Sequence, residues 1–326
     1  MISLKTKFTT QAKIEYPIIC GAMYPCSNPE LVAAVSEAGG LGIVQPLSLV
    51  YVHGYEFKKG LERIKQLTSK PFGMNVIVEK NAKIYEDRMK KWVDEALLAG
   101  CRFFITALGN PKWVVDKVKA VGGFVYHDVT EKKWAQKVVD FGIDGLICVN
   151  QRAGGHAGSK SSEDLFRELS SFGLPLICAG GIGDENDFLH ALQLGYAGVQ
   201  MGTRFIATAE CNSHVDYKNA IVAAEEKDIV KTERITGVPL AVIRTPYVDK
   251  VGLKVGPVSR MLFKNRHTKH WIRFFYNLRA VAAMKKTALK GVSTKDYYQA
   301  GKSVHGIEKV EPVKVIIDRF VRSLTS

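Results

Sequence analysis

The sequence predicts an α/β fold: a (β/α)8 TIM barrel with an inserted, mostly helical lid domain after strand eight. Eight short apolar runs alternate with longer amphipathic stretches through the first two thirds of the 326-residue chain. The alternation stops after Cys211, and one amphipathic segment follows near the end of the chain. Apolar strands separated by helices indicate parallel strands buried on both faces. Eight of them favour a closed barrel over the alternative, a doubly wound open sheet.

Each predicted strand is a run of four to seven mainly apolar residues. The expected strands span residues 18–23, 41–45, 72–78, 103–108, 124–129, 145–150, 176–180 and 199–202. The stretches between them predict helices at 29–38, 56–68, 83–99, 111–120, 131–141, 162–171 and 185–194. Five of these are followed by a glycine that suits a helix C-terminus, namely Gly39, Gly100, Gly142, Gly173 and Gly195.

We expect residues 1–211 and 294–326 to form the barrel, and residues 212–293 to form the helical substrate or lid domain. Helical patterns at 215–226 and 271–286 flank a stretch rich in proline and glycine at 237–257. The amphipathic segment at 311–324 is expected to supply the eighth barrel helix.

Composition places the chain among globular proteins. Hydrophobic residues make up 46% and charged residues 24%. No run of 18 apolar residues exists, so no membrane span is expected, and the N-terminus lacks a signal-peptide pattern. The six cysteines form no CxxC motif, which favours buried free thiols in a reducing cytoplasm. No HExxH motif or zinc-finger spacing occurs, so no metal is expected.

The net charge of +14 is concentrated in one segment. Residues 250–290 hold eleven Lys or Arg and no acidic residue, with aromatic side chains at 271 and 274–276. This pattern indicates a solvated basic face, an interfacial helix or a surface for an anionic partner. No nucleic-acid motif accompanies it, so no nucleic-acid partner is expected. We expect a small-molecule substrate, and a homodimer is one assembly that the sequence allows.

Two glycine-rich loops predict a phosphate site. Gly180 and Gly181 lie where the seventh predicted strand ends, and Gly202 and Thr203 lie where the eighth ends. Glycine lets backbone N–H groups approach an anion, and the loops after strands seven and eight are the usual phosphate site of a barrel. Two tight turns are the alternative.

The loop after the sixth strand holds His156 among glycines, in the string from Ala153 to Gly158. Imidazole titrates near neutral pH, which suits general acid/base chemistry, and a surface histidine is the alternative. Polar or small residues also lie in other predicted strands, at positions expected to reach the mouth of the barrel: Ala22, Met23, Asn75 and His127. For Asn75 and His127 a buried structural role is at least as strongly expected.

Six segments resemble the nitronate monooxygenase (2-nitropropane dioxygenase) family, and they occur in the same order. This family includes flavin-dependent enoyl-acyl-carrier-protein reductases and some NADH:quinone reductases. The segments are residues 17–23, 38–42, 71–75, 153–158, 179–182 and 198–205. The resemblance covers about residues 14–245 and returns at 300–303.

The resemblance implies an FMN-binding barrel in which His156 is the catalytic base. It implies that Gly180, Gly181, Gly202 and Thr203 hold the FMN phosphate. It places Ala22, Met23, Asn75, His127, Ala153, Gly154 and Gln200 near the flavin, and Tyr298, Lys302 and Ser303 near the substrate. His127 stands where many relatives carry lysine or another polar residue. Relatives often carry glutamate where this chain has Arg152, and Gln-Gly-Gly or Gln-Gly-Pro at residues 20–22.

Two functions are consistent with this resemblance. The first is oxidation of alkyl nitronates with O₂, and Tyr298 four residues before Lys302 is a spacing associated with it. The second is NAD(P)H-dependent reduction of an enoyl thioester or quinone, which the basic lid favours because these reactants or their carriers are anionic.

Overall fold

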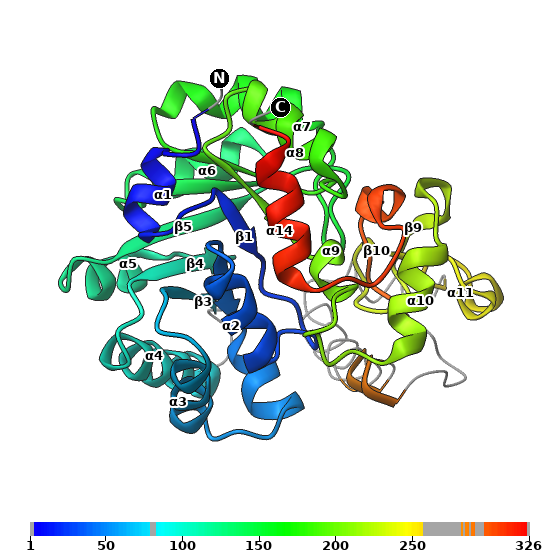
Figure 1. Ribbon diagram of the computed structural model, residues 1–326, viewed down its shortest axis with the longest axis horizontal. Coiled ribbons are helices and arrows are strands. Elements are labelled where there is room, and N and C mark those ends of the chain that lie inside the picture. Colours follow the sequence, from blue (N-terminus) through cyan, green and yellow to red (C-terminus); the bar gives the residue numbers. More distant parts are fainter. Residues whose placement is uncertain are drawn as a thin grey trace.

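The computed structural model describes residues 3–78, 83–256, 282, 284–286, 288–290 and 297–324. Eight parallel strands close into a barrel because β1 pairs with both β2 and β8 (Figure 1). The closure confirms the predicted barrel and excludes the open sheet. The strands are β1 (Ile18–Cys20), β2 (Leu41–Val44), β3 (Phe72–Ile77), β4 (Phe103–Ala107), β5 (Phe124–Val129), β6 (Gly145–Val149), β7 (Leu176–Ala179) and β8 (Gly198–Met201).

Helices follow the strands on the outside of the barrel, as the amphipathic stretches predict. They are α2 (Pro29–Glu37), α3 (Phe57–Leu67), α4 (Lys83–Leu98), α5 (Lys112–Lys119), α6 (Lys132–Val139), α7 (Ser162–Leu169) and α8 (Glu185–Gln193), with the short α9 (Thr203–Ile206) after β8. A π-helical turn (Ser48–Val52) precedes α3, and a 3₁₀ turn (Ser170–Phe172) extends α7. All five predicted C-terminal glycines have positive φ.

The barrel core has two apolar layers. The inner layer lies within the barrel and includes Phe103 and Tyr126, and Phe8 of α1 (Lys7–Ala12) packs against both rings. The outer layer lies between the strands and the helices. Because side chains of a strand alternate between faces, membership of these layers shows which residues point into the barrel. This alternation decides which side chains reach the site.

The first strand ends three residues earlier than predicted. Beyond Cys20 the chain leaves the sheet for a turn, in which the Met23 amide donates to Ser27 Oγ at 2.9 Å and the Ser27 amide donates to Met23 O at 2.9 Å. Ala22 and Met23 therefore lie in a loop at the carboxyl end of the barrel.

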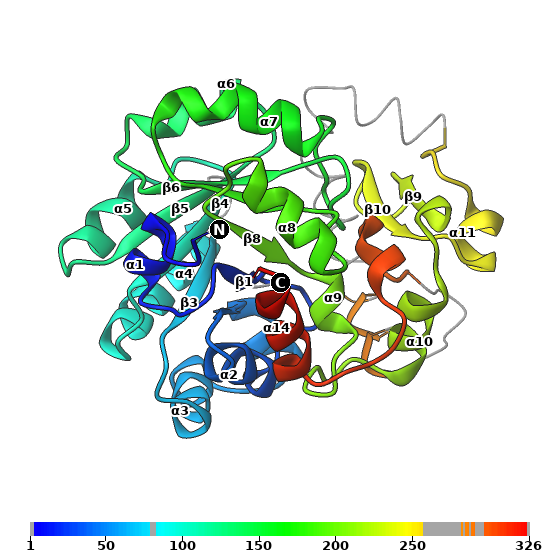
Figure 2. The same cartoon turned by 45° about the horizontal axis from the view of Figure 1, so that its top comes forward.

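The last helix, α14 (Val313–Arg322), closes the ring next to α2 and α8, beside the N-terminal part of the chain (Figure 2). The rings of Phe320 and Phe188 stack with centroids 5.7 Å apart. It begins after Pro312, which occupies the N-cap, so it starts two residues later than expected.

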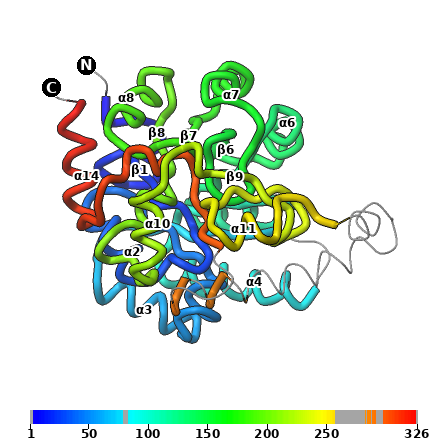
Figure 3. The backbone as a smooth tube through the Cα atoms, turned by 90° about the vertical axis from the view of Figure 1, so that its right-hand side faces the viewer, coloured from blue at the N-terminus to red at the C-terminus, as the bar shows by residue number. Residues whose placement is uncertain are grey.

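The segment predicted to form the lid, which we call the lid below, contains strands as well as helices in its described part. Its described elements are α10 (Val215–Ala223), a 3₁₀ turn (Glu226–Asp228), β9 (Ile229–Thr232), β10 (Leu240–Ile243) and α11 (Pro246–Val251). They gather on one side of the barrel, with α10 and α11 towards the viewer in Figure 3. β9 and β10 form an antiparallel hairpin, which the sequence did not predict. Most of the basic segment and most of the predicted helix at 271–286 lie outside the described residues.

All six cysteines are buried and free, as predicted. Among the residues that the structure describes, none forms a helix both long and apolar enough to cross a membrane.

Candidate active site

The carboxyl ends of the strands open into a cavity of about 1310 Å³ beneath the lid. This end of a barrel is where its enzymes place their sites. Tyr217, Leu240 and Gln299 are among the residues that border the cavity from the lid side. The volume exceeds the ~300–1,000 Å³ that is typical of pockets for one small molecule. It therefore has room for a cofactor and a second reactant.

One inward residue at or just beyond the end of each strand lines the cavity floor. These residues are Gly21, Gln45, Asn75, Ala107, Asp128, Val149, Ala179 and Gln200. Several of them stand two positions after a residue of the inner layer, as Asp128 does after Tyr126. The floor has few polar side chains, namely Gln45, Asn75, Asp128 and Gln200.

Two polar atoms of this floor are buried without a partner among the described residues. They are Gln200 Oε1 and Asp128 Oδ1. Burial raises the pKa of Asp128 to about 7. Asn75, by contrast, donates from Nδ2 to Ile105 O at 3.3 Å. Unsatisfied buried polar atoms cost free energy, so a ligand that pairs with them gains affinity.

His127 borders the cavity but faces the other way from Asp128. It shares the helix-facing side of β5 with Val125 and Val129. Its Nδ1 lies 2.8 Å from Thr106 Oγ1, and burial lowers its pKa to about 4. The side chain that points into the barrel at this end of β5 is that of Asp128, which the sequence analysis did not single out. Neighbouring residues of a strand point to opposite faces of the sheet, and the composition of the strand does not reveal which of them points inward. The expected contact of His127 with a cofactor stays a prediction.

His156 is held by the lid hairpin. The amide of Gly155 donates to Ala241 O at 3.3 Å, and the Ala241 amide donates to Gly155 O at 2.8 Å. His156 Nδ1 lies 3.2 Å from Pro239 O. A carbonyl oxygen only accepts, so this contact requires the proton on Nδ1 and leaves a lone pair on Nε2.

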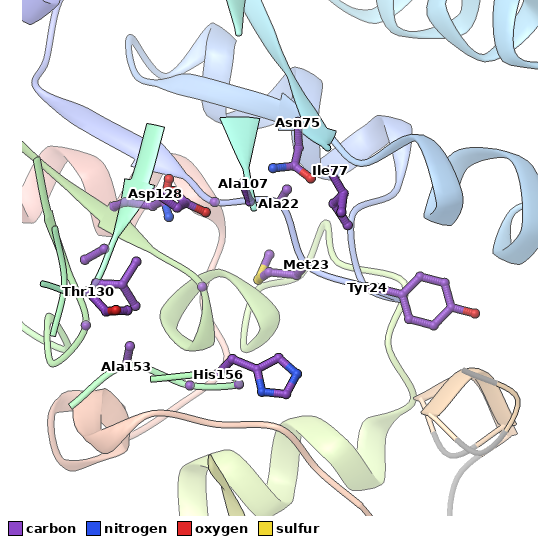
Figure 4. Close-up of a pocket in the computed structure, with 18 of the residues that line it drawn as sticks. Ala22, Met23, Tyr24, Asn75, Ile77, Ala107, Asp128, Thr130, Ala153 and His156 are labelled. Atoms are coloured by element: carbon purple, nitrogen blue, oxygen red, sulfur yellow. The ribbon is translucent and has the colours of Figure 1, made fainter. Parts of the chain in front are cut away.

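The side chain of His156 borders the cavity and is exposed to solvent. Partial desolvation still lowers its pKa, and the bond to Pro239 partly opposes the shift. At neutral pH the imidazole is therefore uncharged and able to accept a proton. Figure 4 shows His156 below Met23, with Asp128 farther across the same pocket.

The two glycine loops lie beside each other at the cavity rim. Gly180 and Gly181 have φ of 114° and 82°. A Cβ on Gly180 would lie 2.6 Å from the Ala153 amide nitrogen, and one on Gly181 would lie 2.5 Å from Arg152 Nε. These glycines are needed for packing against the His156 loop. A Cβ on Gly202 would meet only Met23, at 3.4 Å from Sδ, so the rim is more open there.

The segment 300–303 contacts both the His156 loop and the loop after β8. A Cβ on Gly154 would lie 2.9 Å from the amide nitrogen of Gly301, whose N–H donates to Thr203 Oγ1 at 3.0 Å. The Lys302 amide donates to Arg152 O at 2.8 Å. Ser303 lines the cavity. The structure thus brings Ser303 to the site together with Ala22, Met23, Asn75, His127, Ala153, Gly154, His156, Gly180, Gly181, Gln200, Gly202 and Thr203.

Tyr298 and Lys302 are not among the residues that line the described cavity. Tyr298 is buried and stacks on Tyr217, with ring centroids 4.7 Å apart. Lys302 Nζ points to Glu226, 3.9 Å from Oε2. Their expected contact with substrate therefore stays a prediction.

Arg152 forms an ion pair that the sequence analysis missed. It pairs with Glu226 of the lid, across 74 positions in the chain. Glu226 also lies 3.6 Å from His305 Nδ1. Because Arg152 directly precedes the Ala153–His156 loop, this pair connects the lid to the loop that carries the histidine.

The whole chain, from residue 5 to residue 323, matches the profile of the nitronate monooxygenase family. The chain belongs to this family. The barrel, the glycine loops and the histidine loop described above are thus those of a nitronate monooxygenase family member, and the protein is an oxidoreductase.

Relatives within and near this family differ in their named substrates. The chain is 31% identical to the (3aS,4S,5R,7aS)-5-hydroxy-7a-methyl-1-oxo-octahydro-1H-indene-4-carboxyl-CoA dehydrogenase of Mycobacterium tuberculosis, over 76% of this chain and 68% of that one. It is 26% identical to a probable nitronate monooxygenase of Staphylococcus aureus, over 81% and 85% of the two chains.

Solved structures share the architecture. FabK from Thermotoga maritima superposes with a TM-score of 0.82 at 30% identity, covering 99% of this chain and 97% of that one. A nitroalkane oxidase from Streptomyces ansochromogenes superposes with a TM-score of 0.75 at 21% identity, covering 98% and 97%, which supports the fold alone.

Proposed function

We propose that this family member is an FMN-dependent oxidoreductase that oxidises alkyl nitronates with O₂, with His156 as the general base. The contact between His156 Nδ1 and Pro239 O carries the proposal. It orients the ring and leaves Nε2 able to take the α-proton of a neutral nitroalkane, which forms the nitronate that is then oxidised. A base positioned in this way typically contributes about 10²–10⁴-fold in rate.

The residues around the cavity fit FMN. The unpartnered Gln200 Oε1 and the Asp128 carboxyl offer polar contacts to a heterocycle on the floor. Ala22, Met23, Asn75 and Ala153 would surround the ring, while Gly180, Gly181, Gly202 and Thr203 would hold the phosphate at the rim. FMN would supply the two-electron redox chemistry and the reaction with O₂. The protein would orient the substrate and move its proton.

NAD(P)H-dependent reduction of an enoyl thioester or quinone is the second candidate. The cavity volume of about 1310 Å³ favours it, because an alkyl nitronate is much smaller than the space beside a cofactor. The relatives named for a carboxyl-CoA substrate support a thioester. His156 would first have to take a proton from solvent on Nε2, and would then donate that proton to the substrate carbon. In either reaction we propose that residues 212–293 act as the lid over the substrate.

Anaerobic mixing of the purified protein with a nitronate, NADH and NADPH in turn distinguishes the candidates. Loss of the visible flavin absorbance with the nitronate alone supports nitronate oxidation. Loss with NADH or NADPH, and none with the nitronate, supports the reductase. If no compound changes the absorbance of a flavin-loaded protein, both candidates are wrong.

A further inference from the structure

The function proposed so far gives the carboxyl group of Asp128 only a polar contact to the ring on the cavity floor, and leaves its protonation state without a role. The carboxyl group lies on the inner face of β5 at the cavity floor, one strand away from β6, which leads into the His156 loop. Its Oδ1 is buried without a partner, and no ion pair joins it to a described Lys or Arg. Its inward neighbours Ala107 and Val149 offer no polar atom from a side chain. A lone carboxyl group in such surroundings is costly as an anion.

We propose that Asp128 is a second proton-carrying group of the active site, which presents a protonated carboxyl to the ring system bound over the barrel floor. This inference rests on the proposed function, because FMN is the ring that we expect there. A protonated carboxyl donates one hydrogen bond, whereas a carboxylate only accepts. Loss of the proton would therefore replace a hydrogen bond to a ring carbonyl or nitrogen with repulsion.

Burial brings the pKa of Asp128 close to neutral, whereas it lowers the pKa of the nearby histidines His127 and His156. Burial raises the Asp128 pKa to about 7. Beside it in sequence, His127 has a pKa lowered to about 4 by burial, so it is neutral at pH 7. On β6, burial raises the pKa of the Cys148 thiol well above its usual value. His156, which borders the same cavity, has a lowered pKa, and Lys137 of α6 also borders the cavity.

The test measures FMN binding to the flavin-free protein from pH 6 to pH 9 by flavin fluorescence. Three proteins are compared: wild type, Asp128→Asn and Asp116→Asn. Asparagine has the shape of the protonated acid and does not titrate. Asp116 lies on the exposed face of α5, where it pairs with Lys112, and it controls for the loss of one negative charge.

The ratio of the wild-type Kd to the Asp128→Asn Kd cancels the titration of the FMN phosphate itself. We expect a ratio near one at pH 6 that rises to on the order of tenfold at pH 8, since the fraction of protonated Asp128 falls about tenfold per pH unit above 7. The ratio for Asp116→Asn should stay near one throughout.

A ratio that is constant from pH 6 to pH 9, with measurable binding in both proteins, overturns this inference and leaves the proposed function standing. Failure of all three proteins to bind FMN at any pH overturns both. If Asp128→Asn does not fold, Asp128→Ala also removes the titration and takes its place.

Discussion

Replacing Asp128 with asparagine should stabilise the flavin-free protein at and above neutral pH. In the folded chain its pKa rises from 3.8 to about 7 because the carboxyl is buried. The folded state therefore keeps a proton that the unfolded state loses between about pH 4 and pH 7. The stability that this protonated form confers is complete below pH 4, falls as the pH rises, and is lost by about pH 7.

The size of this effect follows from the shift. About three pKa units at 1.36 kcal/mol each amount to about 4 kcal/mol, as an upper estimate. A chain of this size changes its Tm by roughly 2 °C per kcal/mol. The Tm of Asp128→Asn minus that of wild type should therefore increase by about 5–8 °C from pH 4.5 to pH 8.

Thermal unfolding followed by circular dichroism at pH 4.5, 6, 7 and 8 measures this difference. Asp116→Asn serves as the control, and its Tm difference from wild type should not grow with pH. Only the change in the difference matters, so a constant offset from altered packing does not affect the conclusion. If the difference between Asp128→Asn and wild type is the same at pH 4.5 and pH 8, the carboxyl does not hold its proton and the reasoning fails.

Three further predictions concern the loops. His156→Asn should retain FMN, lose about 10²–10⁴-fold in turnover of a neutral nitroalkane and lose much less with the preformed nitronate; equal small losses would make the residue structural. Gly202→Val should lower the flavin content of soluble protein, because the valine side chain would enter the open rim beside Met23. An unchanged flavin content would show that the phosphate does not bind at Gly202. Arg152→Glu should raise KM or lower kcat, and adding Glu226→Arg should restore part of the loss; no rescue in this charge swap would argue against a lid connection.

The barrel was predictable because its signals are local. Each buried strand is an apolar run, and five helices end at glycines that adopt positive φ. His156 was also predictable, since a histidine among glycines has few structural reasons to be there. The sequence could not reveal that Pro239 orients its ring, because these residues are 83 positions apart.

The missed features depend on distant pairing. β10 is short and lies in a segment rich in proline and glycine, and it is stabilised by pairing with β9, Gly155 and Gln299. Which of His127 and Asp128 points into the barrel depends on the register of the strand, and one sequence does not specify the register. The Arg152–Glu226 pair was missed for the same reason, because it joins the barrel to the lid across 74 positions of the chain.

The flavin content of the purified protein tests the central claim most directly. Heat denaturation followed by chromatography of the released chromophore should yield FMN, close to one molecule per chain. A colourless protein that also fails to take up added FMN would contradict the account, because the unpartnered polar floor and the glycine rim would then serve another ligand.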